Sequence, residues 1–135
     1  THYVESAHDE IERLMGAHRL DFAQFNYSIA ERGAERRLLR AAADRGVAVI
    51  VNQPFASGAL FDRVRGKALP DWAAEFGCAS WAQFFLKFIL GHPAVTCVIP
   101  ATAKARHLED NLGAGRGALP DAATRRRMAD YFDRV

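Results

Sequence analysis

The chain has 135 residues, of which half are hydrophobic and a quarter are charged, as expected for one ordinary globular domain. Its formal net charge of +2 is too small to favour nucleic acid or an anionic membrane surface as the main partner. No apolar run approaches the roughly 18 residues of a membrane span, because Gln83 and Lys87 interrupt the longest candidate, residues 81–90.

The first predicted elements are a helix, a strand and a second helix. Ser6 and Asp9 have the spacing of a capping box and precede apolar residues at helical intervals, which predicts a helix start. Residues 20–27 form a short run rich in aromatic side chains, and their approximate alternation predicts a strand. Residues 31–45 are rich in Ala, Arg and Glu and predict a helix, with Gly46 at its C-terminal cap.

The remainder of the chain repeats this alternation. The β-branched run at residues 47–51 predicts a strand buried on both faces, and residues 94–99 predict another buried strand. A long irregular segment follows the first of these strands. Further helices are expected at residues 71–76, 80–90, 104–112 and 121–134.

Strands that alternate with helices indicate an α/β fold with a parallel sheet. Three strands make a small sheet, and two of them would be edges with unpaired backbone groups. We therefore expect either another part of the protein or a second copy of the chain to cover those edges. The chain shows no internal repeat or linker that would divide it into two domains.

Four segments in order resemble the aldo/keto reductase family. "THY" at residues 1–3 is similar to the end of the family's fifth barrel strand, and "DFAQFNYS" at residues 21–28 to its sixth strand with a Gln-x-Asn motif. "VAVIVNQPFASG" at residues 47–58 is similar to the seventh strand. "CVIPATAKARHLEDN" at residues 97–111 is similar to the eighth strand and the helix after it.

This resemblance implies the C-terminal half of a TIM (β/α)8 barrel, a fold that needs on the order of 250 residues. Residues 1–135 would supply the end of the fifth strand, strands six to eight and the C-terminal helices, with the N-terminal half absent. The chain also begins on Thr rather than Met, and we expect it to come from a longer protein.

The same resemblance implies that the segment after the last strand binds the adenosine end of NADP(H), with NAD as the alternative cofactor. Lys104, Arg106 or His107 would pair with the ribose 2′-phosphate, and Asn111 would reach the adenine. Thr102 belongs to the same segment. An anion is favoured there on physical grounds too, because amide groups at a helix start point outward and carry partial positive charge.

Residues of the loop after the seventh strand would lie along the cofactor pyrophosphate. They are Gln53, Phe55, Ser57 and Gly58, which in the family act mainly through backbone amides. Asn52 occupies the position where many relatives carry a tyrosine that stacks on the nicotinamide.

The resemblance also places Thr1, His2 and Gln24 at the nicotinamide carboxamide. A side-chain amide such as that of Gln24 can donate to a carboxamide and accept from it at once. This would determine which face of the ring presents its hydride.

The family reaction is reduction of a carbonyl by hydride transfer from NADPH, with an Asp, Tyr, Lys and His set on the first four strands. No residue of this chain corresponds to that set, so no catalytic residue is assigned and we expect the isolated chain to be inactive. Two alternatives stay open. One is a non-catalytic binding or regulatory subunit, as in the potassium-channel β subunits that resemble these reductases, and the other is a half barrel that associates with itself. No Cys and His spacing indicates a metal site.

Several other residues have expectations of their own. Tyr27 is expected to pack or line a pocket, and His92 to have a structural role in a turn. The run at residues 125–127 is expected to be a solvated basic face. Cys78 and Cys97 are too few for a disulfide framework, and a buried, reduced Cys97 would favour the cytoplasm.

Overall fold

The computed structural model of the chain describes residues 4–135. Its helices and strands alternate in the following order: α1 His8–Ala17, β1 Phe22–Asn26, α2 Leu38–Asp44, β2 Ala48–Asn52, α3 Ala59–Arg63, α4 Trp81–Leu90, β3 Val95–Val98, α5 Ala105–Gly113 and α6 Ala122–Arg134. Short 3-10 turns lie at Glu5–Ala7, Gly33–Glu35, Ala56–Gly58 and Asp71–Phe76.

The three strands form one parallel sheet in the order β1-β2-β3. Gln24 lies opposite Ile50, Asn26 lies opposite Asn52, and β2 pairs with β3 with one irregularity in register. This confirms the prediction of an α/β fold with parallel strands. The carboxyl ends of all three strands consequently meet at one edge of the sheet.

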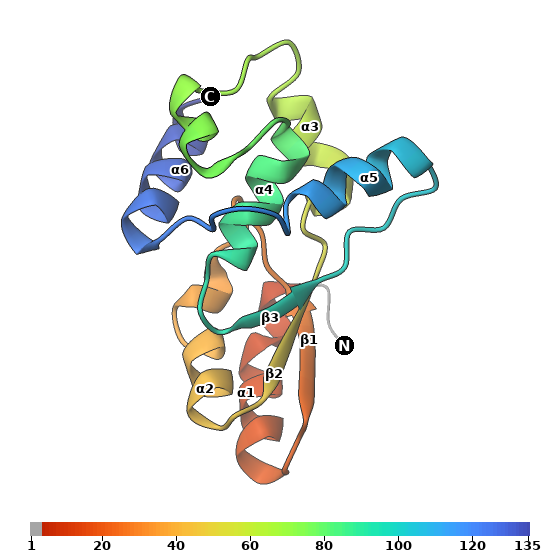
Figure 1. The fold of residues 1–135 in the computed structure, drawn as a ribbon. Coiled ribbons are helices and arrows are strands. Elements are labelled where there is room, and N and C mark those ends of the chain that lie inside the picture. The colour runs from red at the N-terminus through yellow and green to blue at the C-terminus, as the bar shows by residue number, and fades with distance from the viewer. Residues whose placement is uncertain (1–3) are drawn as a thin grey trace.

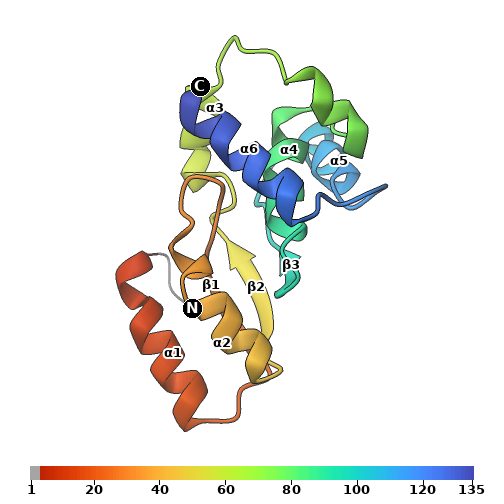
Figure 2. The ribbon, with the colours of Figure 1, turned by 90° about the vertical axis from the view of Figure 1, so that its left-hand side faces the viewer.

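Helices α1 and α2 cover one face of the sheet, and the opposite face of β1 and β2 carries no helix of the described chain (Figures 1 and 2). Helices α3 to α6 gather beyond the carboxyl ends of the strands, in the upper part of Figure 1. One buried apolar cluster runs from the covered face, with Phe25, Val49 and Leu39, into the helices above, with Phe85 and Phe132.

The expectation that residues 94–99 form a buried strand is wrong. Thr96 and Cys97 of β3 are exposed, and Ile99 just beyond the strand is 47% exposed. At the other edge, Phe22 of β1 is 64% exposed. Apolar composition predicts burial only where another element covers the side chain, and within residues 4–135 nothing covers these edges.

Two helix boundaries also differ from the predictions. Ser6 does not cap the first helix: α1 starts at His8, its N-cap is Ala7, and Asp9 instead pairs with Arg37 of the segment before α2. The helix expected at residues 31–45 is confined to Leu38–Asp44. A turn precedes it, in which the Ser28 side chain accepts a hydrogen bond from the backbone of residue 31.

Other boundaries are confirmed at their caps. The Ser80 hydroxyl accepts from the Gln83 amide at 3.1 Å and starts α4, and the Asp121 carboxylate accepts from the Thr124 amide at 2.7 Å and starts α6. Gly46, just past α2, has a left-handed backbone with φ +65. The long segment after β2 is less irregular than expected, because it includes α3.

Arg125 does not belong to a solvated face, and the expectation for it is wrong. The residue is only 8% exposed, and its side chain donates to the Phe88 carbonyl at 2.8 Å, to the Glu35 carboxylate at 2.5 Å and to the Tyr27 hydroxyl. Tyr27 is fully buried, as expected, and donates to Glu35. Burial, the largest effect, raises the pKa of Tyr27 above its ordinary value.

His92 has the structural role expected of it. It lies in the turn after α4, and its Nδ1 atom accepts a hydrogen bond from the Ala94 amide at 3.2 Å. Burial and the nearby Arg125 lower the pKa of His92.

Of the helices described, none has the length and apolarity needed to cross a bilayer. Residues 4–135 contain no group of three potential metal ligands.

Candidate functional site

A depression of about 550 Å³ lies at the carboxyl ends of β1 and β2. It contains six of the predicted site residues, which come from two strand ends and the loop after β2: Gln24, Asn52, Gln53, Phe55, Ser57 and Gly58. Pro54, Phe61, Ile99 and Ala101 complete its lining. The parallel register explains this convergence, because Gln24 and Asn52 lie on neighbouring strands and on the same face of the sheet.

A second depression, of about 370 Å³, adjoins the first and shares Phe55, Phe61 and Ala101 with it. Three further predicted site residues line it: Thr102, His107 and Asn111. Nine of the thirteen predicted residues therefore border one or the other of two adjoining depressions.

The remaining four predicted residues do not join this group. Lys104 and Arg106 are exposed, and in the structure of residues 4–135 they line neither depression. Thr1 and His2 lie outside the described residues. Of the three basic candidates for a phosphate, His107 alone borders the depressions, while Lys104 and Arg106 flank it at the start of α5.

The loop after β2 has an unusual backbone. Gln53, Ala56 and Ser57 have φ values of 54, 47 and 55, in the left-handed region that favours glycine, and Gly58 follows with φ 98. Each such non-glycine residue costs about 1–2 kcal/mol. The Ser57 hydroxyl donates to the Gln53 side chain at 2.8 Å and closes the loop on itself. Clustered strain of this kind is typical of ligand-binding loops held by their surroundings.

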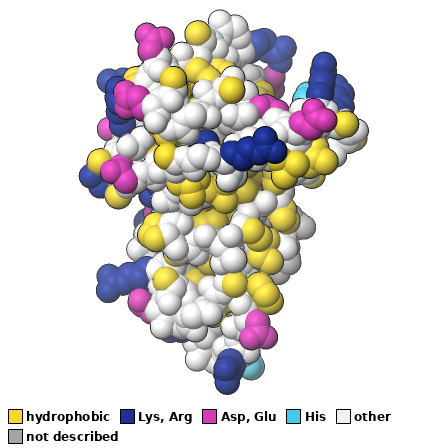
Figure 3. Space-filling view, viewed as in Figure 1, with side chains coloured by type: hydrophobic (Ala, Val, Ile, Leu, Met, Phe, Trp, Pro, Cys, Tyr) yellow, Lys and Arg dark blue, Asp and Glu magenta, His cyan; other side chains and the backbone are white. Residues whose placement is uncertain are grey.

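The amino end of α5 is open toward an anion. Its N-cap is Lys104, whose side chain makes no capping bond, and no acidic residue lies in the first turn. The Lys104 amide donates to the Thr102 hydroxyl at 3.2 Å. First-turn amides without a capping side chain retain their partial positive charge. In Figure 3, basic, histidine and acidic side chains lie together over this end of α5, while hydrophobic side chains line its underside.

Asp110 lines the second depression and links α5 to α4. Its carboxylate accepts from the Ser80 hydroxyl and from the Gln83 side-chain amide, both at 2.7 Å. These bonds tie α5 to the start of α4. They hold Asn111, the next residue, at the wall of the depression.

Aromatic rings form the boundary between the two depressions. The Phe55 and Phe61 ring centroids are 4.9 Å apart, and Phe61 lies 5.8 Å from Phe85 of α4. Trp81 stacks on Phe85 at 5.6 Å. An apolar wall beside strand-end amides suits a ligand with a flat ring and polar substituents.

Two buried polar side chains, His8 and Asn26, and the exposed Glu31 support the end of β1. The Nε2 atom of His8 lies 3.2 Å from the Asn26 side-chain oxygen, and the Asn26 side-chain nitrogen donates to Glu31 at 3.2 Å. Asn26 thus links α1 to the turn after β1. It lies two residues from Gln24, on the same face of the strand.

The sequence predictions omitted four lining residues of the first depression, Pro54, Phe61, Ile99 and Ala101. Pro54 lies within the predicted loop, and Ile99 and Ala101 follow β3 directly, so the rule that strand ends meet at one edge could have found all three. Phe61 lies on α3, a helix that the sequence did not predict, and carried no comparable signal.

The sequence profile of the aldo/keto reductase family matches residues 4–126. The chain therefore belongs to the aldo/keto reductase family. A search of the curated proteins found no match.

Solved structures show the same fold. Aldo-keto reductase AKR11C1 from Bacillus halodurans matches with a TM-score of 0.69 and 17% identity in both its holo and its apo form. The match covers 92% of this chain and 46% of the holo structure. The thermostable aldo-keto reductase Tm1743, solved with the inhibitor epalrestat, matches at 0.62 and 22% identity, over 81% of this chain and 39% of that one. The chain thus spans less than half the length of the structures that it matches.

Proposed function

We propose that the chain is the cofactor-binding, C-terminal half of an NADP(H)-dependent aldo/keto reductase that reduces a small carbonyl compound. The observation that carries this proposal is the pair of adjoining depressions at the carboxyl ends of the strands, which nine of the predicted residues border. Ligands of parallel α/β barrels bind at this end of the strands.

The residues present fit a nicotinamide dinucleotide. Gln24 offers a donor and an acceptor for the carboxamide in the first depression, and Ile99 offers an apolar contact beside Asn52. The loop from Gln53 to Gly58, with its left-handed residues, lines the first depression, reaches the second through Phe55 and suits the pyrophosphate.

The adenosine end fits the second depression. His107 and Asn111 border it, and Lys104 and Arg106 add positive charge outside it. A ribose 2′-phosphate at the uncapped start of α5 would meet amide dipoles and basic side chains together. This arrangement is our reason for preferring NADP(H) to NAD(H).

When bound, the cofactor supplies the hydride. The residues of this chain would bind and orient the cofactor, and among the described residues that border the two depressions none corresponds to the family's Asp, Tyr, Lys and His set. We therefore propose that the isolated chain binds NADPH without reducing carbonyls. A steady-state assay in which the chain alone oxidises NADPH on addition of a carbonyl would contradict this part of the proposal.

Cofactor binding is tested by titrating the chain with NADPH and NADH and following cofactor fluorescence. We expect NADPH to bind more tightly, with an affinity that falls as salt is raised. The double change of Lys104 and Arg106 to Ala should weaken NADPH and leave NADH unchanged. Gln24→Ala should weaken both cofactors about ten-fold, as expected for loss of a buried hydrogen bond. Equal affinities for the two cofactors in the unmodified chain would refute the assignment of the 2′-phosphate.

The open sheet edges favour a partner. Phe22 at one edge and Ile99 at the other are exposed, as is Leu112, at 59%, on α5 beside β3. We propose that the other half of the barrel covers them in the complete protein. Self-association of two copies is the alternative. Light scattering of the chain distinguishes the two, since a defined dimer supports self-association and a monomer supports a separate half.

Both cysteines are free thiols, in keeping with a cytoplasmic protein.

A further inference from the structure

The strained loop needs support from outside itself. The Ser57 to Gln53 hydrogen bond is internal to the loop and cannot fix it relative to the strands. Helix α3 begins at Ala59, directly after the loop, and carries Phe61, which borders both depressions and packs on Phe55. Any movement of α3 therefore changes both the loop and the aromatic wall.

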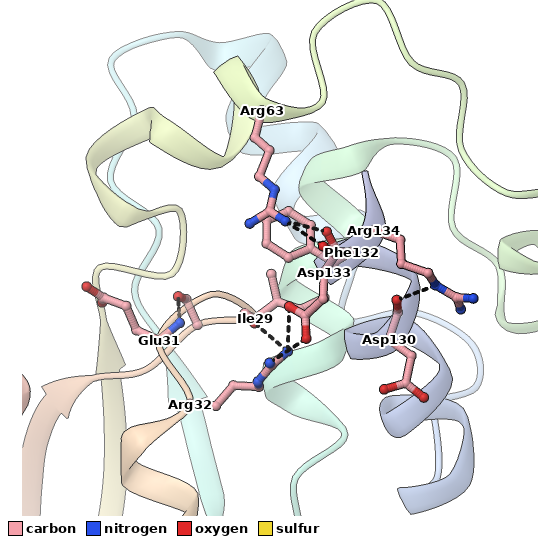
Figure 4. A network of polar contacts seen from close by, with 9 residues as sticks. Ile29, Glu31, Arg32, Arg63, Asp130, Phe132, Asp133 and Arg134 are labelled. Carbon is pink, nitrogen blue, oxygen red and sulfur yellow. Dashed lines mark hydrogen bonds and ion pairs between the residues drawn. The ribbon is translucent and has the colours of Figure 1, made fainter.

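The last residue of α3 is fastened to the end of α6. One guanidinium nitrogen of Arg63 donates to the Phe132 carbonyl at 2.9 Å and to the Asp133 carbonyl at 3.1 Å. The guanidinium carbon also lies 4.3 Å from the centroid of the Phe132 ring. Figure 4 shows Arg63 reaching down from α3 onto the end of α6. A cation at this position is favoured because the carbonyl end of a helix carries partial negative charge.

The same end of α6 also holds the turn after β1. Arg32 pairs with the Asp133 carboxylate at 2.7 Å and donates to the Ile29 carbonyl at 3.1 Å (Figure 4). Phe132 is itself fully buried in the core. The end of α6 is therefore anchored in the core, and it binds both the segment after β1, through Arg32, and the segment after β2, through Arg63.

We propose that Arg63 is a positioning residue for the candidate site. By joining α3 to the end of α6, it keeps the left-handed residues of the loop, Gln53 and residues 56–58, in their conformation and Phe61 against the depressions. It does this through the backbone of α6 and touches no ligand. Without this link the strained loop relaxes, and the conformation that binds becomes a minor one.

The effect on the loop can be measured without any cofactor. Arg63→Met keeps the apolar stem over Phe132 and removes the donors. We expect amide exchange of residues 55–61 to speed up about ten-fold, with the exchange of β1 and β2 unchanged. Arg63→Lys can still donate to the α6 carbonyls and should restore most of the protection. Arg65→Met is the matched control, because Arg65 lies two residues away, is exposed and pairs with its neighbour Asp62 on α3.

Unchanged exchange in residues 55–61 of Arg63→Met would overturn the proposal. So would equal acceleration throughout the chain, which would indicate general destabilisation, or an equal effect of Arg65→Met. A second arm, which rests on the proposed function, titrates the same variants with NADPH. If the loop adopts its binding conformation about a tenth of the time, the apparent Kd should rise about ten-fold. A loosened loop in a chain that binds no NADPH would support the link through Arg63 and refute the cofactor assignment.

Discussion

Replacing Arg125 by Met should destabilise the protein strongly, because this arginine is buried and makes three polar contacts. The methionine retains an apolar side chain over Phe88, whose ring centroid lies 4.6 Å from the guanidinium carbon. The change therefore mainly removes hydrogen bonds and charge.

The magnitude follows from the partners left behind. A hydrogen bond to a charged group contributes about 1.5–3 kcal/mol, and a carboxylate without its buried partner costs more. Glu35 is a third exposed and can regain water, which reduces its share. We expect the free energy of unfolding to fall by about 3 kcal/mol, and Tm by about 10 °C for a chain of this length.

Urea unfolding followed by circular dichroism measures this difference. The matched control is Arg126→Met, the same substitution at the next residue, where the side chain is exposed. It should change the free energy of unfolding by less than about 0.5 kcal/mol. Equal losses in the two variants would show that the buried contacts of Arg125 contribute nothing, and would refute the reasoning.

Three further outcomes are expected. Lys87→Met should lower the free energy of unfolding by about 2 kcal/mol in urea, because the buried ammonium donates to the carbonyls of Arg116 and Ala118 at 2.6 and 2.9 Å; an unchanged midpoint would contradict this. Ala56→Gly should raise Tm by relieving about 1 kcal/mol of left-handed strain, whereas Ala59→Gly in helical backbone should lower it. Burial raises the pKa of Tyr27 above the value of about 10 in the unfolded chain. The neutral Tyr27 side chain therefore makes its full contribution to the free energy of unfolding below about pH 10, and this contribution is lost as the pH rises further. Stability should therefore decline above about pH 10, and Tyr27→Phe should reduce this decline more than Tyr131→Phe does.

Short sequence patterns predicted those strands and helix starts that depend on neighbouring residues in the chain. The β-branched run at residues 47–51 indicated a strand, and the hydroxyl of Ser80 and carboxylate of Asp121 mark helix starts through bonds to amides three residues on. The capping spacing of Ser6 and Asp9 was misleading, because Asp9 has a competing partner in Arg37, 28 residues away. A local sequence pattern cannot indicate a competing partner such as Arg37, which is brought close to Asp9 only when the chain folds.

In the candidate site too, some residue positions follow from the sequence and others depend on tertiary packing. Strand ends of a parallel sheet meet whatever their sequence, so the order of strands alone is enough to group Gln24, Asn52 and the loop after β2. The outward position of Lys104 and Arg106 depends on the rotation of α5 about its axis, which packing against α4 determines through Asp110.

The sequence by itself determined the succession of strands and helices, the parallel sheet and the family, because these depend on the period of apolar residues and on short motifs. The tertiary structure decided which apolar residues are covered, that Arg125 is buried, and that Ala56 and Ser57 take left-handed backbone. These features depend on contacts between residues far apart in the chain, and their energies exceed the local preferences that a sequence displays.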